Sequence, residues 1–137
     1  MLNRLLELEQ HTVAAYAAGI PLLGRSAGKA AKQFLGQELT HAGTLGGLVK
    51  QAGGKAVRPR ASYDLGHPST SADVLALLHR LEAEQLAAYL QMLPALSPGR
   101  LRSTVAAIMA NDAQHLSVLR QSLGQPPVPA ALATGRE

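Results

Sequence analysis

The chain has 137 residues, a formal net charge of +4 and no cysteine, which excludes disulfides, thiolate zinc sites and cysteine nucleophiles. This length suits one domain with one core. Leu and Ala dominate the hydrophobic residues and β-branched residues are sparse, so helices are favoured over a sheet. The basic residues are scattered without interleaved aromatic residues, so we expect no nucleic-acid surface. No apolar run reaches the ~18 residues of a membrane span.

The first predicted helix covers residues 2–20, because apolar residues recur there at helical spacing. Glu9 lies at the centre of its apolar stripe, and Pro21 and Gly24 mark its end. No signal peptide is visible, although the helical pattern already begins at Leu2. A cytoplasmic location is therefore the default expectation, and an export signal trimmed from the chain is the alternative.

The second predicted helix begins after Ser26, a suitable N-cap, and ends before Gly53. Its inward stripe includes Glu38 and His41, which are three residues apart and therefore point the same way. Residues 53–70 follow as a connection rich in Gly, Pro, Ser and Arg, which is long for a compact domain.

A four-helix bundle gives this long connection a purpose. A helix of about 27 residues is ~40 Å long, whereas an extended connection of this length reaches ~60 Å. The connection can therefore return along the whole bundle, so that the second and third helices run parallel.

The third predicted helix can be capped by Thr70 or Ser71, with Asp73 in its first turn, where the helix dipole favours a negative charge. It ends near Pro94. Glu82 lies in its apolar stripe, in the same setting as the single carboxylate of the first helix.

The fourth predicted helix begins at Ser97-Pro98, a cap followed by proline at the first helical position, and ends at Gly124. Its apolar stripe includes Asp112 and His115. We therefore expect an all-α fold in which residues 1–124 form a four-helix bundle. Residues 125–137 are expected to be an extended or disordered Pro-rich tail.

An internal repeat supports two equivalent halves. A carboxylate followed seven residues later by a tyrosine occurs twice, 73 residues apart, as Glu9 and Tyr16 and as Glu82 and Tyr89. A carboxylate followed three residues later by a histidine also occurs twice, 74 residues apart, as Glu38 and His41 and as Asp112 and His115. A helix pair used twice about a pseudo-twofold axis would present two equivalent half-sites to one centre.

This arrangement predicts a dinuclear metal site. Carboxylates buried in a Leu-rich core are very costly unless they are compensated. No Lys or Arg lies on the predicted inward stripes, so a cation or a proton must compensate each carboxylate. Carboxylate oxygens and imidazole nitrogens together suit iron or manganese.

These residues resemble the ferritin-like superfamily of four-helix bundles, in particular its small bacterial ferritin-like domain proteins, over residues 2–123. In that family, two helices each supply a Glu and the other two each supply Glu-x-x-His. By this resemblance, Glu38 and Asp112 would bridge two metal ions. The remaining ligands would be Glu9 and His41 at one end and Glu82 and His115 at the other.

One position departs from the family pattern, which has Glu where Asp112 stands. Asp is one methylene shorter, so we expect an incomplete bridge and a weaker half-site with Glu82 and His115. An Asp112→Glu substitution should then tighten the second metal-binding step.

The resemblance implies three functions, which the sequence leaves open. The first is a redox-active di-iron or manganese protein that acts on O₂ or peroxide and could oxidise Fe²⁺. The second is a structural or interaction bundle whose site is empty or non-catalytic, which the shorter Asp112 favours. The third is a small assembly for metal storage or transport.

Several other residues have two interpretations. Tyr16 and Tyr89 are either core tyrosines with satisfied hydroxyls or hydrogen-bond donors to the metal-binding carboxylates. His79, one turn before Glu82, is either a partly buried polar residue or an additional ligand. His11 is expected to face solvent.

The second helix also carries a stripe of small residues on the face opposite its candidate ligands: Gly36, Thr40, Gly43 and Gly47. Glycine in a helix interior costs roughly 0.5–1 kcal/mol relative to alanine. The prediction is a homodimer in which the same helix of a second chain approaches this face. The alternative is a helix that has acquired glycine without consequence.

Overall fold

Four α-helices form the structured core of residues 1–136, the part of the chain that this computed structural model describes; Glu137 lies outside it. The helices are α1 (Leu2–Gly19), α2 (Arg25–Gln51), α3 (Ser71–Met92) and α4 (Arg100–Ser122). Two short 3-10 turns, η1 (Ile20–Leu22) and η2 (Leu93–Ala95), follow α1 and α3 at equivalent places in the two halves. The prediction of an all-α four-helix bundle is confirmed.

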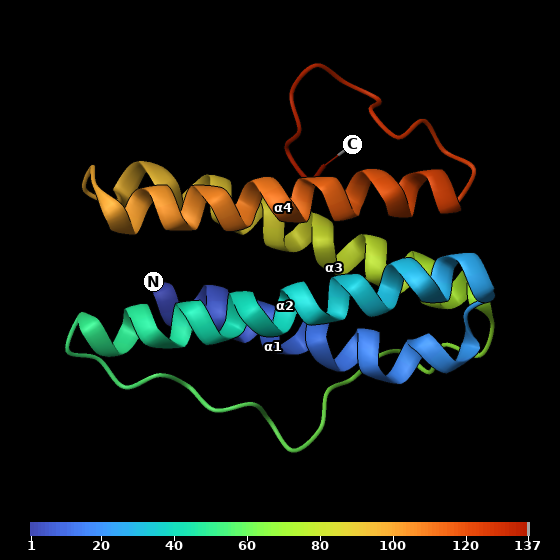
Figure 1. Cartoon of the computed structure of the whole chain (residues 1–137), viewed down its shortest axis with the longest axis horizontal. Coiled ribbons are helices and arrows are strands. Elements are labelled where there is room, and N and C mark those ends of the chain that lie inside the picture. The colour runs from blue at the N-terminus through green and yellow to red at the C-terminus, as the bar shows by residue number, and fades with distance from the viewer. Residues whose placement is uncertain (137) are drawn as a thin grey trace.

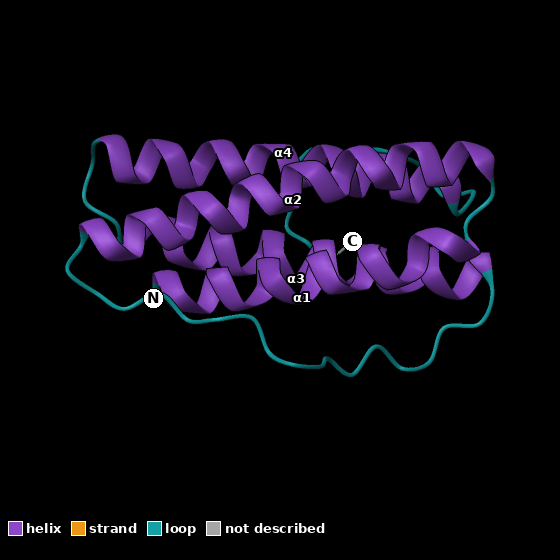
Figure 2. Ribbon diagram, turned by 60° about the horizontal axis from the view of Figure 1, so that its bottom comes forward, coloured by secondary structure: helices purple, strands orange, loops and turns teal. Residues whose placement is uncertain are grey.

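The helices form two antiparallel hairpins, α1 with α2 and α3 with α4, and α1 also packs against α3. The segment between α2 and α3 returns along the length of the bundle, so these two helices run parallel (Figures 1 and 2). We call residues 52–70 the crossover. This route is the one that the length of the connection predicts.

The ends of the helices agree only in part with the sequence prediction. Thr70 caps α3 through a reciprocal capping box with Asp73. Ser26 was the wrong cap for α2, because the amide of Gly28 already donates to the carbonyl of Gly24 and starts the helix earlier. The predicted start of α4 at Ser97-Pro98 was also wrong.

The chain after η2 explains the later start of α4, whose N-cap is Gly99. Leu96 turns into the core and is buried. The Arg102 guanidinium then donates to the carbonyl of Leu96, which holds the chain in a non-helical conformation there. Gly99 has φ 131°, which residues other than glycine rarely adopt, and it redirects the chain into the helix.

The crossover is anchored mainly on α1. The Asn3 side chain bonds the backbone of Lys55 and Val57, and the Gln10 amide donates to the carbonyl of Val57 at 3.1 Å. The His11 ring stacks on Tyr63 of the crossover with ring centroids 5.2 Å apart. The expectation that His11 faces solvent was therefore wrong, because the crossover covers it.

Two apolar clusters fill the bundle on either side of a polar layer. One surrounds Tyr16, Phe34 and Leu78 near η1, and the other surrounds Leu45 and Tyr89 near η2. These clusters hold the helices at fixed spacing and exclude water from the layer between them. Within residues 1–136, no helix has a stretch long and apolar enough to cross a membrane.

The segment after α4 extends back over the bundle (Figure 1). The Ser117 hydroxyl donates to the carbonyl of Pro127 at 3.0 Å. Gly135 lies so close to the backbone of Ala83 that a Cβ atom there would overlap its carbonyl oxygen. The boundary of the bundle at residue 124 stays a prediction.

The difference between the Thr70 and Ser26 caps gives a first test. Thr70→Ala should lower the free energy of unfolding by about 1 kcal/mol, because it leaves an amide of the first turn of α3 without its partner. Ser26→Ala should change it by less than about 0.5 kcal/mol, as for other surface substitutions. Urea unfolding followed by circular dichroism measures both, and equal effects would contradict the assignment of the caps.

Candidate metal centre

Four carboxylates and two imidazoles, contributed by all four helices, meet in the polar layer. Their donor atoms form two groups of four, and within each group the atoms lie within 4.8 Å of one another. The first group comprises Glu9, Glu38, His41 and Asp112, and the second comprises Glu38, Glu82, Asp112 and His115. Glu38 and Asp112 belong to both groups, so the two groups overlap.

Local helical geometry explains why the sequence brings these side chains inward. Glu38 and His41 lie three residues apart on α2, and the buried Phe34 and Leu45 lie one turn beyond them on either side. The same spacing holds on α4. All four carboxylates are fully buried, and His41 is the most exposed of the six residues at 8%.

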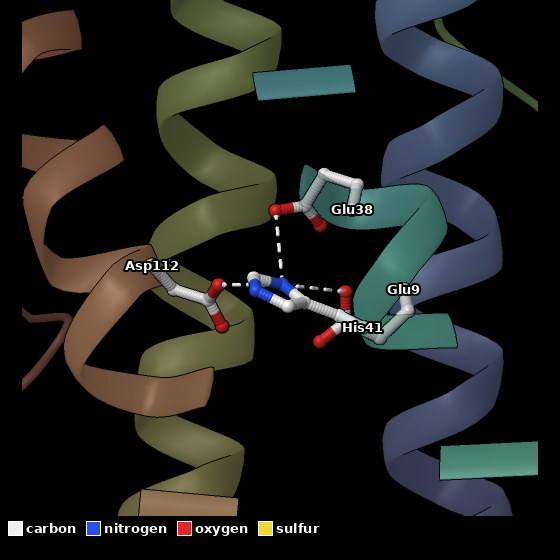
Figure 3. A group of neighbouring side chains, drawn as sticks. All are labelled: Glu9, Glu38, His41 and Asp112. Carbon is white, nitrogen blue, oxygen red and sulfur yellow. Dashed lines mark ion pairs between the residues drawn. The ribbon is translucent and has the colours of Figure 1, made fainter. Parts of the chain in front are cut away.

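The first group is centred on the His41 ring (Figure 3). Its Nδ1 atom lies 3.2 Å from Asp112, 3.5 Å from Glu38 and 3.6 Å from Glu9. These three carboxylates come from three different helices, α4, α2 and α1 (Figure 3). One imidazole nitrogen therefore faces three carboxylate oxygens.

In the second group, the His115 ring has contacts in addition to those with the carboxylates. The Nδ1 atom of His115 lies 3.2 Å from Glu38 and 3.2 Å from Glu82. Its Nε2 atom lies 2.8 Å from the side-chain oxygen of Gln37, and the Phe34 ring stacks on the imidazole with centroids 4.1 Å apart. Gln37 thereby favours Nε2 as the protonated nitrogen and leaves Nδ1 for the carboxylates.

The two tyrosines join the halves crosswise. The Tyr16 hydroxyl on α1 donates to Glu82 on α3 at 2.6 Å, and the Tyr89 hydroxyl on α3 donates to Glu9 on α1. Both rings are fully buried. Each tyrosine thus orients the carboxylate of the other half, as the pseudo-twofold repeat requires.

A buried chain of hydrogen-bonded side chains, not predicted from the sequence, lies beside the site. The Thr12 hydroxyl donates to Gln85 at 2.8 Å, and the Gln85 amide donates to Glu38 at 3.0 Å. A signal was available, because these residues follow Glu9 and Glu82 by three positions, the spacing of the two carboxylate-histidine pairs. Gln37 gave no such signal, since only the packing of α2 against α4 shows which ring it contacts.

His79 does not belong to either group of donors. It is half-buried, and burial together with the nearby positive charge of Arg120 lowers its pKa. Arg120 itself is buried, although the sequence analysis placed no basic residue on an inward stripe. The interpretation of His79 as an additional ligand receives no support from this geometry.

The donor set fits divalent metal ions. Within residues 1–136, six buried donor atoms of the centre have no hydrogen bond: Glu9 Oε2, Glu38 Oε1, His41 Nδ1, Glu82 Oε2, Asp112 Oδ1 and Asp112 Oδ2. Four of them meet opposite charge only through the histidine ion pairs, whereas Glu82 Oε2 and Asp112 Oδ2 have neither kind of partner. Buried polar atoms are rarely left without a partner. Two divalent cations would neutralise four carboxylates and accept these unused lone pairs.

Burial raises the pKa of three of the carboxyl groups. The pKa of Glu9 rises well above its usual range, that of Glu82 rises to about 8 and that of Asp112 to about 6. Burial is the largest cause in each case, and repulsion from neighbouring carboxylates adds to it. At neutral pH, Glu82 is therefore mostly protonated, and the pKa of Glu9 shifts in the same direction.

The pKa of Glu38 is lowered and the pKa values of the two histidines are raised, as expected for ion pairs between them. Burial alone raises the pKa of Glu38, but hydrogen bonds with His115 and His41 outweigh it and the net shift is downward. Burial lowers the histidine pKa values, yet the carboxylates raise them overall, to about 12 for His41 and about 9 for His115. Protons thus supply the positive charge in the metal-free centre.

Both the sequence and the fold of this chain are similar to those of known proteins. The profile of the ferritin-like domain family matches residues 1–125. The fold is also similar to the crystal structure of a conserved hypothetical protein, rv2844, from Mycobacterium tuberculosis. The TM-score is 0.85 at 20% sequence identity over 96% of this chain and 93% of that chain. No curated protein matches the sequence significantly.

The protonated centre predicts how stability depends on pH. The folded-state pKa values of Glu82 (about 8) and His115 (about 9) lie above their ordinary values, so their contributions to stability are lost as the pH rises through these values. Between pH 6 and pH 9 the melting temperature of the metal-free protein should therefore fall. Each proton held only by the folded chain contributes about 1.4 kcal/mol per pH unit.

Metal should reverse this slope, because binding releases protons and strengthens as the pH rises. Thermal unfolding with and without excess Mn²⁺, followed by circular dichroism, measures both slopes. Glu82→Gln removes one titrating group and should flatten the metal-free slope. A metal-free melting temperature that rises between pH 6 and pH 9 would contradict the protonation pattern.

Gln37 should act as a positioning residue for His115. Gln37→Leu removes the acceptor of the Nε2 proton and should weaken metal binding by about 10–100-fold. Gln37→Glu keeps an acceptor and should restore most of the affinity. Nitrogen NMR of His115 should also show a loss of the Nε2-protonated form in Gln37→Leu. The matched control is Asn111→Leu, at the α4 position that corresponds to Gln37 in the repeat and directly before Asp112, and its affinity should equal that of the parent.

Proposed function

The chain belongs to the ferritin-like domain family, and from that premise we propose that it binds two transition-metal ions, iron or manganese, and carries out redox chemistry with O₂ or peroxide. Oxidation of Fe²⁺ is one form of this activity. The main support for this proposal is the pair of overlapping donor groups that share Glu38 and Asp112. Their oxygen and nitrogen atoms are those that iron and manganese prefer.

The proposed ligands divide between two half-sites. Glu9 and His41 would hold one metal ion, and Glu82 and His115 would hold the other. Glu38 and Asp112 would bridge them, which the membership of both residues in both groups supports. Asp112 is shorter than the Glu that the family pattern has, so its half-site with Glu82 and His115 is the weaker of the two.

The protein residues would shape the chemistry of the bound metals. Iron supplies one-electron and O₂ chemistry when it is bound in such a site. Tyr16 and Tyr89 hold hydroxyl protons at the oxygens of Glu82 and Glu9, and these hydrogen bonds fix the orientation of both carboxylates. The apolar clusters exclude water, so small oxidants would approach on the side of His41, the least buried of the six residues.

The alternative is a structural or interaction bundle with an empty or non-catalytic site. Glu82 Oε2 and Asp112 Oδ2 weigh against it, because within residues 1–136 these two buried oxygens have neither a hydrogen bond nor an ion pair, and buried polar atoms are rarely left so. The predicted homodimer stays a prediction. Gly36 is exposed on α2 and lies outside the cavity beside the crossover, whereas Leu39, Gly43 and Gly47 line that cavity.

Anaerobic titration with Mn²⁺ or Fe²⁺ tests the proposed site. The parent should bind two ions per chain in unequal steps, and Asp112→Glu should tighten the second step. His115→Ala should lose about one ion per chain, because it removes a ligand that only one half-site uses. His67→Asn is the matched control, since His67 is exposed with φ 54°, which Asn tolerates.

Addition of O₂ or peroxide to the Fe²⁺-loaded parent then tests the reaction. Iron oxidation should be faster than in buffer with the same iron, and His115→Ala should slow it. Full metal binding without faster oxidation would favour the non-catalytic alternative. A His115→Ala protein that binds as much metal as the parent would contradict the ligand assignment.

A further inference from the structure

The crossover, α1 and α2 line an open cavity of about 650 Å³, within the range of small-molecule sites. None of the six candidate metal ligands lines it. Residues next to three of them do, because Gln10 follows Glu9 on α1, and Leu39 and Ala42 follow Glu38 and His41 on α2. The cavity therefore lies on the outer side of the helix pair whose inner side carries the metal centre.

The cavity exists because the crossover is anchored on one wall only. Asn3, Gln10 and His11 fix it to α1. On the α2 side, a Cβ atom at Gly46 would just reach Ala56 and Leu6 at 4.0 Å, and one at Gly43 or Gly47 would have nothing within 4 Å. Close packing within the chain thus does not account for these glycines, which instead widen the cavity.

The equivalent face of the second half is covered. The positions 74 residues after Gly43 and Gly46 are Ser117 and Arg120 on α4. Both lie against the C-terminal segment around Pro127, Val128 and Leu132, an extended and largely apolar stretch. This face of a helix pair in the fold therefore accepts an extended apolar segment. On α1 and α2 the crossover lies over the equivalent face, but no segment of residues 1–136 fills the cavity between the crossover and α2.

The apolar walls and the positive charges of the cavity indicate what kind of ligand it would bind. Its walls are mainly apolar, with Leu6, Val13 and Val57 among them, and no Asp or Glu of residues 1–136 lines it. Two cations line it from different elements, Lys50 on α2 and Arg60 on the crossover. Neither side chain forms an ion pair within residues 1–136.

We propose that this cavity binds an amphiphilic carboxylate, with its alkyl chain against the apolar walls and its head group beside Lys50 and Arg60. An extended alkyl chain matches the shape of the segment that covers the equivalent face. A single anionic head group matches two unpaired cations on an otherwise apolar surface. The site is independent of the metal centre.

Calorimetric titration of the full-length metal-free chain with dodecanoate, below its micelle-forming concentration, tests the proposal. The parent should bind one dodecanoate per chain and should bind dodecyltrimethylammonium at least about tenfold more weakly. Gly43→Leu fills the cavity and should weaken dodecanoate binding by about tenfold or more. The matched control, Gly36→Leu, has equal space around it on the same helix but lies outside the lining, and should bind as the parent does.

A second pair of variants tests the head group. Lys50→Glu combined with Arg60→Glu should weaken dodecanoate binding by about tenfold or more and reverse the preference toward the ammonium amphiphile. Lys55→Glu combined with Arg58→Glu makes the same change in net charge at exposed positions outside the lining and should leave binding unchanged. Circular dichroism establishes that every variant is folded.

Three outcomes would overturn the proposal. They are no dodecanoate binding by the parent at millimolar concentration, equal binding by the parent and Gly43→Leu, and equal effects of the two charge-reversed pairs. Light scattering tests whether a second chain occupies the cavity instead. In that case Gly43→Leu would lower the molecular mass relative to the parent, and dodecanoate would not change the mass of either protein. If the parent binds two metal ions per chain but no dodecanoate, this proposal fails and the proposed metal function still stands.

Discussion

The burial of four carboxylates in one layer of the bundle is the constraint on which the rest of the structure depends. An isolated buried carboxylate is far too costly to persist, so each must meet a positive charge or hold a proton. The two histidines face these carboxylates, and the raised pKa values of Glu9 and Glu82 complete the compensation in the metal-free chain. The Leu-rich clusters on either side make this balance necessary, because they exclude the water that would otherwise screen the charges.

The pseudo-twofold repeat distributes this balance over both halves of the molecule. Tyr16 and Tyr89 exchange hydrogen bonds with the carboxylates of the opposite half, and Thr12 meets Gln85, its counterpart in the repeat. Each hairpin therefore depends on the other to satisfy part of its polar groups. The symmetry is not complete, since Gln37 supports one histidine and the residue 74 positions later is the shorter Asn111.

Most of the fold could be predicted from the sequence because its signals are local. Helical spacing of Leu and Ala, the Thr70 cap and the length of the crossover depend on neighbouring residues or on reach alone. The candidate ligands could be identified because a carboxylate in an apolar stripe is an anomaly that needs an explanation. The contacts of Gln37 and His11 could not, since each depends on an element distant in sequence, α4 for one and the crossover for the other. The Ser97-Pro98 start failed because Arg102 reaches back to Leu96, a contact that outweighs local preference.

The crosswise tyrosine bonds also bear on the origin of such a chain. Because each hairpin supplies one carboxylate, one carboxylate-histidine pair and one tyrosine for its opposite, two copies of a single hairpin would contain every element of the centre. The present chain thus has the composition of a symmetric pair fused into one polypeptide. In that view the crossover serves as a tether that needs only sufficient reach, and its sequence was free to diverge. Fusion also released the two copies from identity, which allowed Asp112 to stand opposite Glu38 and one outer face to be covered while the other stayed open.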